Sequence, residues 1–240
     1  MIEHHADHIY SFRIVLPKNP LGWLNCYGIK GVNGGRDLLI DSGFNTPRCL
    51  ADLKKGMTAL DMRPENTDVF FTHAHFDHLG NASNLQDMGC RLLMGKREYA
   101  FYQEAPWVTQ KEHSRKDGIP DRLRGSLDVN KGCPAPGFTV ETVEEGQVLR
   151  YGGYELECVH TPGHTPGGVC YFFPADKLLL SGDTLFAGSV GRTDFPGGSM
   201  ARMMDSLQAL MKLPDDTLVI PGHGGHTTIG DERRTNPYIV

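Results

Sequence analysis

The segment Thr72-His73-Ala74-His75-Phe76-Asp77-His78 places three imidazoles and one carboxylate within seven residues. It follows the short apolar stretch Asp68-Val69-Phe70-Phe71, so a predicted strand (67–72) ends where these polar side chains gather. Imidazole and carboxylate together are the ligands expected for zinc, iron or manganese. The segment therefore predicts a metal site at the end of a strand.

The spacing within this segment indicates two metal positions rather than one. His73 and His75 are two residues apart, so on an extended or turning chain both point to the same side. Asp77 and His78 follow where the chain turns into a helix, and they can face a second point a few ångströms away. A purely structural role would have to account for three imidazoles beside a carboxylate at one strand end, and such clusters rarely form without a metal.

The whole chain has the composition of a globular protein and favours one domain over two. It has 240 residues, of which 39% are hydrophobic and 22% charged. The net charge of −5 argues against nucleic acid as a partner, and no apolar stretch approaches the roughly 18 to 20 residues of a membrane span. The polar N-terminal residues (1–8) predict no signal peptide, and the six scattered cysteines predict reduced thiols, so a cytoplasmic location is expected.

Strand and helix patterns alternate along the chain and restart in its second half. A helix is predicted to begin near Pro47, and another after the histidine segment, with Leu79, Ala82, Leu85 and Met88 on one side. Two β-rich halves, each with helices, predict a sandwich of two sheets with the helices outside. Strands are predicted at 9–16, 23–29, 37–40, 67–72, 91–94, 138–143, 147–149, 154–160, 169–173, 177–180 and 217–220, and further helices at 199–213 and after Gly230.

Four further segments have the same form as the first, a strand that ends in a polar, glycine-rich turn. They are residues 39–43, 160–167, 181–186 and 220–224. Each is weak evidence alone: the pair His160 and His164 is more often structural, and Asp183 fits a turn or a helix cap. Ligands that arrive from several strand ends can nevertheless be held rigidly, as a metal site requires.

Taken in order, these residues resemble the metallo-β-lactamase superfamily, over the chain from Asp41 to its end. The resemblance implies an α/β fold, an αββα sandwich of two mixed sheets with helices on both outer faces and the metal site at one edge. It also implies two divalent ions, with zinc expected and iron or manganese as the alternatives. The implied ligands are His73, His75 and His164 for one ion, Asp77, His78 and His223 for the other, and Asp183 as a bridge between them.

The turn segments are most similar to the glyoxalase II-like (hydroxyacylglutathione hydrolase-like) branch, and residues 228–238 look like its small bacterial members. This implies hydrolysis of a thioester or ester by a hydroxide held between two metals, with Asp77 as a ligand that also orients the proton of the water. Full-length glyoxalase II enzymes carry a further helical domain that supplies much of the glutathione site. The residues after His223 (224–240) are too few for such a domain, so recognition of glutathione does not follow.

Three other functions remain open. Persulfide dioxygenases resemble the same branch, including a segment like Gly191-Arg192-Thr193-Asp194, and use one iron to oxidise a glutathione-linked sulfur. A nuclease is less favoured, because the nucleic-acid-processing relatives carry basic surfaces that this acidic chain lacks. A non-enzymatic metal-binding or signalling protein is the third class. The partner expected from the favoured function is a small-molecule substrate, and the oligomeric state stays open.

The remaining polar residues receive weaker predictions. Asp41 is expected to accept an N–H from a ligating imidazole, whereas His160 fits a supporting role at the metal or a purely structural one equally well. The segment Gly95–Gly137 is predicted to be a surface connection or a lid over the site, since residues 111–124 are basic. A mobile terminus, with adventitious metal binding as the alternative, is expected for His4, His5 and His8, and a structural or surface role for His113 and His226.

Overall fold

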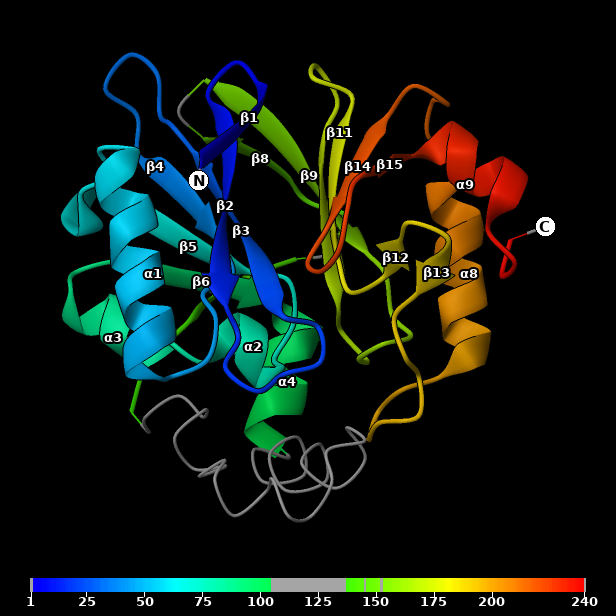
Figure 1. Ribbon diagram of the computed structural model, residues 1–240, viewed down its shortest axis with the longest axis horizontal. Coiled ribbons are helices and arrows are strands. Elements are labelled where there is room, and N and C mark those ends of the chain that lie inside the picture. Colours follow the sequence, from blue (N-terminus) through cyan, green and yellow to red (C-terminus); the bar gives the residue numbers. More distant parts are fainter. Residues whose placement is uncertain (1, 105–136, 145, 152, 240) are drawn as a thin grey trace.

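The computed structural model describes residues 2–104, 137–144, 146–151 and 153–239 (Figure 1). The predicted connecting or lid segment is described only at its two ends. Its basic stretch (111–124), together with His113 and Cys133, lies outside the described residues. The five cysteines within the described parts, at positions 26, 49, 90, 158 and 170, are free thiols, as predicted.

Two large mixed sheets and a small hairpin make up the strands of the described chain. The first sheet has the order β1-β2-β3-β4-β5-β6-β7 and the second the order β15-β14-β11-β10-β9-β8. The strands of the first sheet are β1 (Ile2–Ala6), β2 (Ile9–Val15), β3 (Trp23–Ile29), β4 (Asp37–Ile40), β5 (Thr67–Phe71), β6 (Arg91–Gly95) and β7 (Glu141–Val143). Those of the second are β8 (Val148–Tyr151), β9 (Tyr154–His160), β10 (Val169–Phe173), β11 (Leu178–Gly182), β14 (Leu218–Pro221) and β15 (Thr227–Thr228), and the hairpin pairs β12 (Leu185–Phe186) with β13 (Ser189–Val190).

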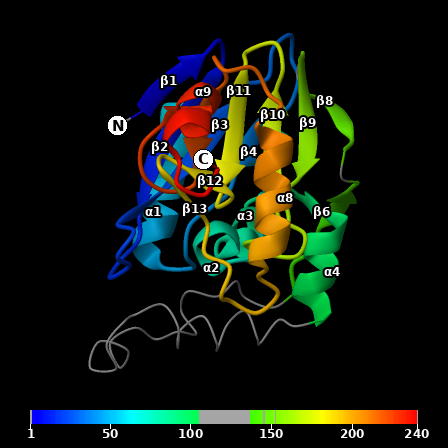
Figure 2. The same cartoon turned by 90° about the vertical axis from the view of Figure 1, so that its right-hand side faces the viewer.

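The helices cover the outer faces of the two sheets, which gives the predicted αββα sandwich (Figures 1 and 2). Packed against the first sheet are α1 (Pro47–Ala59) and α3 (Ala82–Asp87), and against the second α8 (Met200–Leu210) and α9 (Ile229–Thr235). The short α2 (Phe76–Leu79) and α4 (Lys96–Glu104) follow β5 and β6, and a single 3₁₀ turn spans Pro64–Asn66. In Figure 2, α8 and α9 lie in front of the second sheet.

Alternation along the strands separates three layers of core. Phe70 points into the layer between the sheets with Tyr27 and Tyr171, whereas its neighbours Val69 and Phe71 pack under the helices of the first sheet. All five side chains are fully buried. The sheets are therefore joined by a continuous apolar layer, and polar groups can collect only at its edges.

The direction of the strands decides which edge carries the polar turns. Strands β4, β5 and β6 run parallel to one another, as do β11 and β14. The carboxyl ends of parallel strands meet at one edge of a sheet, where side chains from distant parts of the chain converge. The turns that follow β4, β5, β9, β11 and β14 hold all the predicted metal-site residues.

The predicted single helix after the histidine segment is wrong, because the chain forms the two short helices α2 and α3 with a break at Gly80 and Asn81. A Cβ on Gly80 would lie 2.5 Å from the backbone nitrogen of Asn45. The side-chain amide of Asn81 donates to the carbonyls of Ser42 (2.7 Å) and Phe44 (2.8 Å). Close packing against residues 42–45 therefore interrupts the helix.

The prediction of a mobile N-terminus is also wrong for the described residues. Residues 2–6 form β1, which pairs with β2 in antiparallel register and places Ile2 opposite Phe12. Elsewhere the predicted elements are present with boundaries shifted by up to three residues, as at the start of β7 (predicted 138, observed Glu141) and the end of α8 (predicted 213, observed Leu210). Within the described parts of the chain, no helix combines the length and apolar character needed to cross a membrane.

Candidate metal centre

All seven predicted ligands lie together at the edge between the two sheets. They form overlapping groups in which one potential ligand atom from each residue lies within 4.8 Å of the others. The groups are His73, His75 and His164; Asp77, His78 and His223; and His73, His78 and Asp183. The ligand assignment itself stays a prediction, but the proximity on which it depends is present.

The first group joins the turn after β5 to the turn after β9. Nε2 of His164 lies 2.7 Å from Nδ1 of His75. The ring of His73 stands nearly perpendicular to both neighbours, with ring centroids 4.6 Å from His75 and 4.9 Å from His164. Three imidazole edges thus surround one point.

The second group joins α2 to the turn after β14. Nε2 of His223 lies 3.3 Å from Nε2 of His78 and 3.3 Å from Oδ2 of Asp77. Asp183, from the turn after β11, reaches both groups. Its Oδ1 lies 3.4 Å from Nε2 of His78, and its Oδ2 lies 3.6 Å from Nε2 of both His164 and His223. This is the placement that a bridging carboxylate requires.

Hydrogen bonds on the outer side of the imidazoles fix where their protons lie. Nδ1 of His78 donates to Oδ2 of Asp41 (2.7 Å), as predicted for that aspartate. Nδ1 of His164 donates to the carbonyl of Arg192 (2.7 Å), and Nδ1 of His223 donates to the carbonyl of Trp23 (2.8 Å). In each ring Nδ1 carries a proton, so Nε2 is the nitrogen that faces the centre and can offer a lone pair to a metal.

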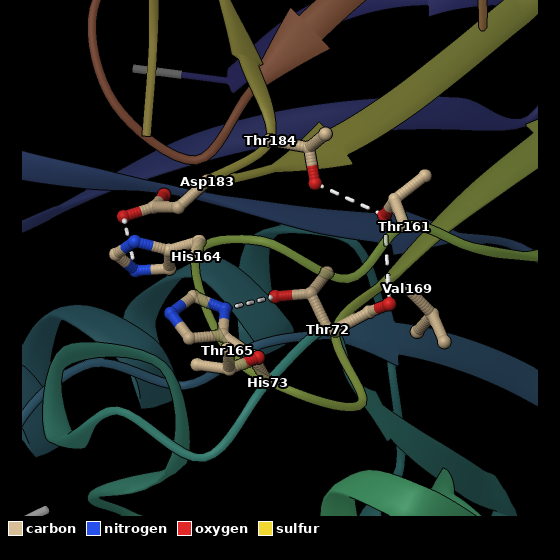
Figure 3. Close-up of a pocket in the computed structure, with 9 residues that line it drawn as sticks. Thr72, His73, Thr161, His164, Thr165, Val169, Asp183 and Thr184 are labelled. Atoms are coloured by element: carbon tan, nitrogen blue, oxygen red, sulfur yellow. Dashed lines mark hydrogen bonds and ion pairs between the residues drawn. The ribbon is translucent and has the colours of Figure 1, made fainter. Parts of the chain in front are cut away.

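Nδ1 of His73 also donates away from the centre, in this case to a hydroxyl group (Figure 3). The hydroxyl of Thr72 donates to Oδ2 of Asp41 (2.8 Å), so it accepts from Nδ1 of His73 (3.0 Å). Nε2 of His73 is buried and has no hydrogen-bond partner. An unpartnered lone pair in such a place is costly unless a cation accepts it.

The arrangement fits metal ions because bare nitrogen lone pairs and carboxylate oxygens face one another at short range. Between Nε2 of His78 and Nε2 of His223, for example, two neutral rings that both donate from Nδ1 would have no proton to share. A cation relieves this repulsion. Two histidine-rich groups with a shared carboxylate match the ligand chemistry of zinc or iron.

The electrostatics of the centre favour the protonation states that metal ligands need at His73, His164 and Asp183. At His78 and His223, by contrast, the nearby carboxylates raise the pKa and favour the protonated ring until a metal displaces the proton. Burial lowers the pKa of His73 well below its usual value, and burial likewise lowers the pKa of His164. Burial opposes ionisation of Asp183, but the surrounding imidazoles, His223 first, hold its pKa well below the usual range. Burial alone would lower the pKa of His78, but the neighbouring carboxylates, Asp41 first, raise it well above its usual value.

Glu98 on α4 supports the first group and was not expected from the sequence. This fully buried carboxylate accepts from the backbone N–H of Ala74 (2.8 Å) and of Gly167 (2.9 Å). Ala74 lies between His73 and His75, and Gly167 lies in the turn that holds His164, so Glu98 ties the two turns together. A single glutamate within a charged helix carries no signal that separates it from a surface residue.

Strand β3 supports His223 and was also missed. Asn25 donates from its side chain to the carbonyls of Pro221 (2.9 Å) and Gly224 (3.1 Å), and its own N–H donates to the carbonyl of Gly222 (2.8 Å). The hydroxyl of Tyr27 donates to the carbonyls of Ile220 (3.2 Å) and Pro221. One strand of the first sheet thus holds the turn of the second sheet that carries a predicted ligand.

Gly222 leaves room for the centre. A Cβ at this position would lie 2.6 Å from Oδ1 of Asp183 and 2.8 Å from Cε1 of His78. Any larger residue would push one of these side chains away. The glycine is therefore required by close approach.

Three other residues, His160, Arg192 and Phe195, lie at the margin of the centre. Nε2 of His160 lies 3.3 Å from the carbonyl of Pro166, so this histidine braces the turn that holds His164. The ring of Phe195 stands against His75 with centroids 5.7 Å apart, and the guanidinium of Arg192 covers the same phenyl ring at 3.9 Å. These two side chains form a partly apolar wall beside the first group.

The chain matches a known protein family and is similar to several known proteins and solved structures. Residues 21–223 match the family model described as the metallo-beta-lactamase superfamily. Hydroxyacylglutathione hydrolase GloC of Haemophilus influenzae is 34% identical over 174 residues, which cover 71% of this chain and 74% of that protein.

Solved structures agree with this match. TTHA1623 in a di-iron-bound form superposes with a TM-score of 0.70 at 34% identity, covering 95% of this chain and 99% of that one. ETHE1 from Myxococcus xanthus superposes with a TM-score of 0.63 at 25% identity, covering 95% of this chain and 83% of that one.

Proposed function

The chain belongs to the metallo-beta-lactamase superfamily, and on that premise we propose that it is a hydrolase of thioesters or esters that works with two divalent metal ions. The observation that carries the proposal is the pair of ligand groups that share the Asp183 carboxylate. His73, His75 and His164 would hold one ion, and Asp77, His78 and His223 the other. Zinc is the metal proposed first, with iron and manganese as alternatives.

The proposed reaction adds the oxygen of water to the acyl carbon and breaks the bond from that carbon to sulfur or oxygen. The products are a carboxylic acid and a thiol or an alcohol, which leaves with a proton. Two bound divalent ions supply a water of lowered pKa and an electrophile for the carbonyl oxygen. The remaining steps concern protons and orientation, and the side chains of this protein perform them.

Asp77 is the proposed proton acceptor. Its side chain is 15% exposed, compared with 9% for Asp183, so of the two ligand carboxylates it is the more accessible from solvent. Its Oδ2 lies 3.3 Å from Nε2 of His223, beside the second metal position. From there the carboxylate can accept a proton from the attacking water and keep its oxygen directed at the substrate.

The other polar groups hold the proposed ligands in place during this reaction. Asp41, the Trp23 carbonyl and the Arg192 carbonyl each keep a proton on Nδ1 of a ligand imidazole, so that Nε2 stays available. The proposed thioester substrate rests on the similarity to GloC, which is described as a hydroxyacylglutathione hydrolase. A small-molecule substrate is therefore proposed as the partner of the site.

A persulfide dioxygenase that uses one iron is the second candidate. The similarity to TTHA1623, which was solved with two iron ions, favours iron as a metal that such a site accepts. The second ligand group offers a place for a second ion, which the proposed hydrolysis uses and a one-iron enzyme does not need. The two candidates differ in their need for O₂.

The deciding experiment combines metal analysis with two activity assays. Protein purified without chelators is analysed for zinc, iron and manganese, then tested against a panel of thioesters and esters and, separately, for O₂ uptake with glutathione persulfide. We expect at least two metal equivalents and thioester or ester hydrolysis without O₂ uptake. Persulfide-dependent O₂ uptake without hydrolysis would establish the second candidate instead.

Asp77→Asn provides a matched variant for the hydrolase assay. The amide keeps the size of the side chain and an oxygen ligand but cannot accept the proton. We expect kcat to fall more than about a hundredfold in this variant, in line with the contribution of general base catalysis. An unchanged kcat at equal metal content would remove Asp77 from the proposed role.

A further inference from the structure

A second group of metal-ligand side chains lies outside the centre described above. Glu3 and His5 on β1 and His226 in the turn between β14 and β15 each offer one ligand atom, and these atoms lie within 4.8 Å of one another. Glu3 and His5 are two residues apart on a strand, so they share one face of the sheet. The intervening His4 points to the other face, where its ring lies 5.0 Å from that of Tyr10.

The contacts within this group leave its ligand atoms directed at one another. Nδ1 of His226 lies 3.8 Å from Oε1 of Glu3, and the rings of His5 and His226 meet edge to face with centroids 4.9 Å apart. Neither separation is a hydrogen bond. The first is at ion-pair distance when His226 is protonated, and the second is an edge-to-face ring contact.

His5 is oriented in the way that metal-binding histidines usually are. Its Nε2 lies 2.8 Å from the hydroxyl of Ser11, which is only 4% exposed. This bond engages one ring nitrogen, and the other ring nitrogen stays available to a metal ion. A ligating imidazole commonly donates its second nitrogen to such a neighbour, which fixes the tautomer and the plane of the ring.

We propose that Glu3, His5 and His226 form a third metal site, which binds a zinc ion. Two imidazoles and one carboxylate are an established zinc ligand set, with water in the fourth position. The partial exposure of Glu3 (54%) and His226 (26%) leaves room for that water. The proposal uses none of the residues of the candidate centre and does not depend on its activity.

The location gives this ion a structural role. Strand β1 is an edge strand of the first sheet, and β15 is an edge strand of the second. An ion bound by Glu3, His5 and His226 therefore links the two sheets at these edges. His226 follows His223 by three residues, in a turn whose carbonyls accept hydrogen bonds from Asn25 and Tyr27. Zinc at this site therefore restrains the turn that carries His223.

The test is the zinc stoichiometry of the whole protein at buffered micromolar free zinc, measured by equilibrium dialysis and elemental analysis. We expect the His5→Ala, His226→Ala double variant to bind one equivalent fewer than the unaltered protein. His4→Ala is the matched control, since it removes a neighbouring histidine from the other face of β1, and it should keep the full stoichiometry. The comparison is a difference, so it holds whatever number of ions the candidate centre binds.

Two further measurements keep the proposal falsifiable if the double variant folds poorly. Glu3→Gln changes a half-exposed side chain and should weaken the additional zinc equivalent by about tenfold or more, with an unaltered circular dichroism spectrum. The zinc-dependent rise in Tm should be smaller in this variant than in His4→Ala. Equal stoichiometry in all variants, or equal loss in His4→Ala, would show adventitious surface binding and overturn the proposal.

Discussion

At the scale of single residues, the acceptor behind each imidazole decides whether that ring can bind a metal. Asp41 accepts from Nδ1 of His78 (2.7 Å), from the hydroxyl of Thr72 (2.8 Å) and from the backbone N–H of Thr72 (2.9 Å). One buried carboxylate thus sets the tautomer of His78 directly and that of His73 through Thr72. Its influence reaches both groups of predicted ligands.

Replacing Asp41 should therefore weaken metal binding without removing a ligand. Asp41→Asn places an amide N–H₂ against groups that themselves donate, and we expect the affinity for metal to fall about 10-fold to 100-fold. Competition with a chromogenic chelator measures the change. Asp37→Asn is the control: this carboxylate lies on β4, the strand that Asp41 follows, but pairs with Lys30 (2.8 Å), and its replacement should leave metal affinity unchanged. Equal affinities in the two variants would contradict the role of Asp41.

Gly222 provides a second prediction at this scale. Gly222→Ala brings a methyl group to 2.6 Å from Oδ1 of Asp183, so we expect the protein to lose at least about one metal equivalent at limiting free metal. Elemental analysis after dialysis measures this. In the same turn Gly225 has no atom within 4 Å of an added Cβ, so Gly225→Ala should retain both ions of the centre. Full metal content in Gly222→Ala would show that the neighbouring side chains can move aside.

At the scale of secondary structure elements, α4 connects the two turns of the first metal position. Its residue Glu98 accepts backbone N–H groups from the turn after β5 and from the turn after β9. Burial raises the pKa of Glu98 from 4.5 to about 7, although the hydrogen bonds from Ala74, Thr165 and Gly167 act in the opposite direction. Glu98, which links the two turns, therefore changes its charge near neutral pH.

This pKa shift predicts how the stability of the metal-free protein depends on pH. The folded pKa of Glu98 is the higher one, so between about pH 4.5 and 7 the folded state binds more protons than the unfolded chain. The contribution of Glu98 to the free energy of unfolding is complete below about pH 4.5 and is lost as the pH rises through about 7. The glutamine of Glu98→Gln stays neutral at every pH, so this variant does not lose that stability as the pH rises.

Urea unfolding of the metal-free protein across this pH range tests the prediction. We expect the free energy of unfolding, relative to Glu98→Gln, to fall by up to about 3 kcal/mol from pH 4.5 to 8. Glu104→Gln, at the exposed end of the same helix, should follow the unaltered protein at every pH. If Glu98→Gln shows the same pH dependence as Glu104→Gln, the carboxylate ionises outside this range.

At the scale of the whole molecule, the metal centre lies where two sheets meet, and its predicted ligands come from both. His73, His75, Asp77 and His78 follow strand β5 of the first sheet, whereas His164, Asp183 and His223 follow strands of the second. Metal ions that bind all of them add a link between the sheets beside the apolar layer. Binding to the folded state alone raises the free energy of unfolding.

Removal of metal should therefore lower the thermal stability of the protein. With free metal at a hundredfold excess over Kd, we expect a loss of about 2.7 kcal/mol for each site when a chelator removes the ion. Calorimetry after addition of two equivalents of zinc measures the recovery of Tm. Asp183→Ala removes the shared carboxylate, and it should stay folded with a smaller response of Tm to zinc than the unaltered protein and no turnover. Full activity in this variant, or in His75→Ala, would refute the assignment of the site.

Much of the centre could be predicted from the sequence, because ligand chemistry resides in residue types and in local spacing. The histidine segment, the turns with His164, Asp183 and His223, and the supporting role of Asp41 were each visible as a strand that ends in a polar turn. The break between α2 and α3 was not visible, since it arises from packing of Gly80 and Asn81 against a distant segment. Glu98 looked like an ordinary helix residue until the fold placed it between two turns.

The sequence alone thus determined the αββα class and which side chains can bind metal, because strand alternation and ligand type are local properties. Tertiary structure alone decided how those side chains are held. The carbonyls of Trp23 and Arg192 fix the protons of His223 and His164, and a backbone carbonyl is the same in every residue. The approach of His226 to Glu3 and His5 likewise depends on how two sheet edges meet, which no short segment of the chain encodes.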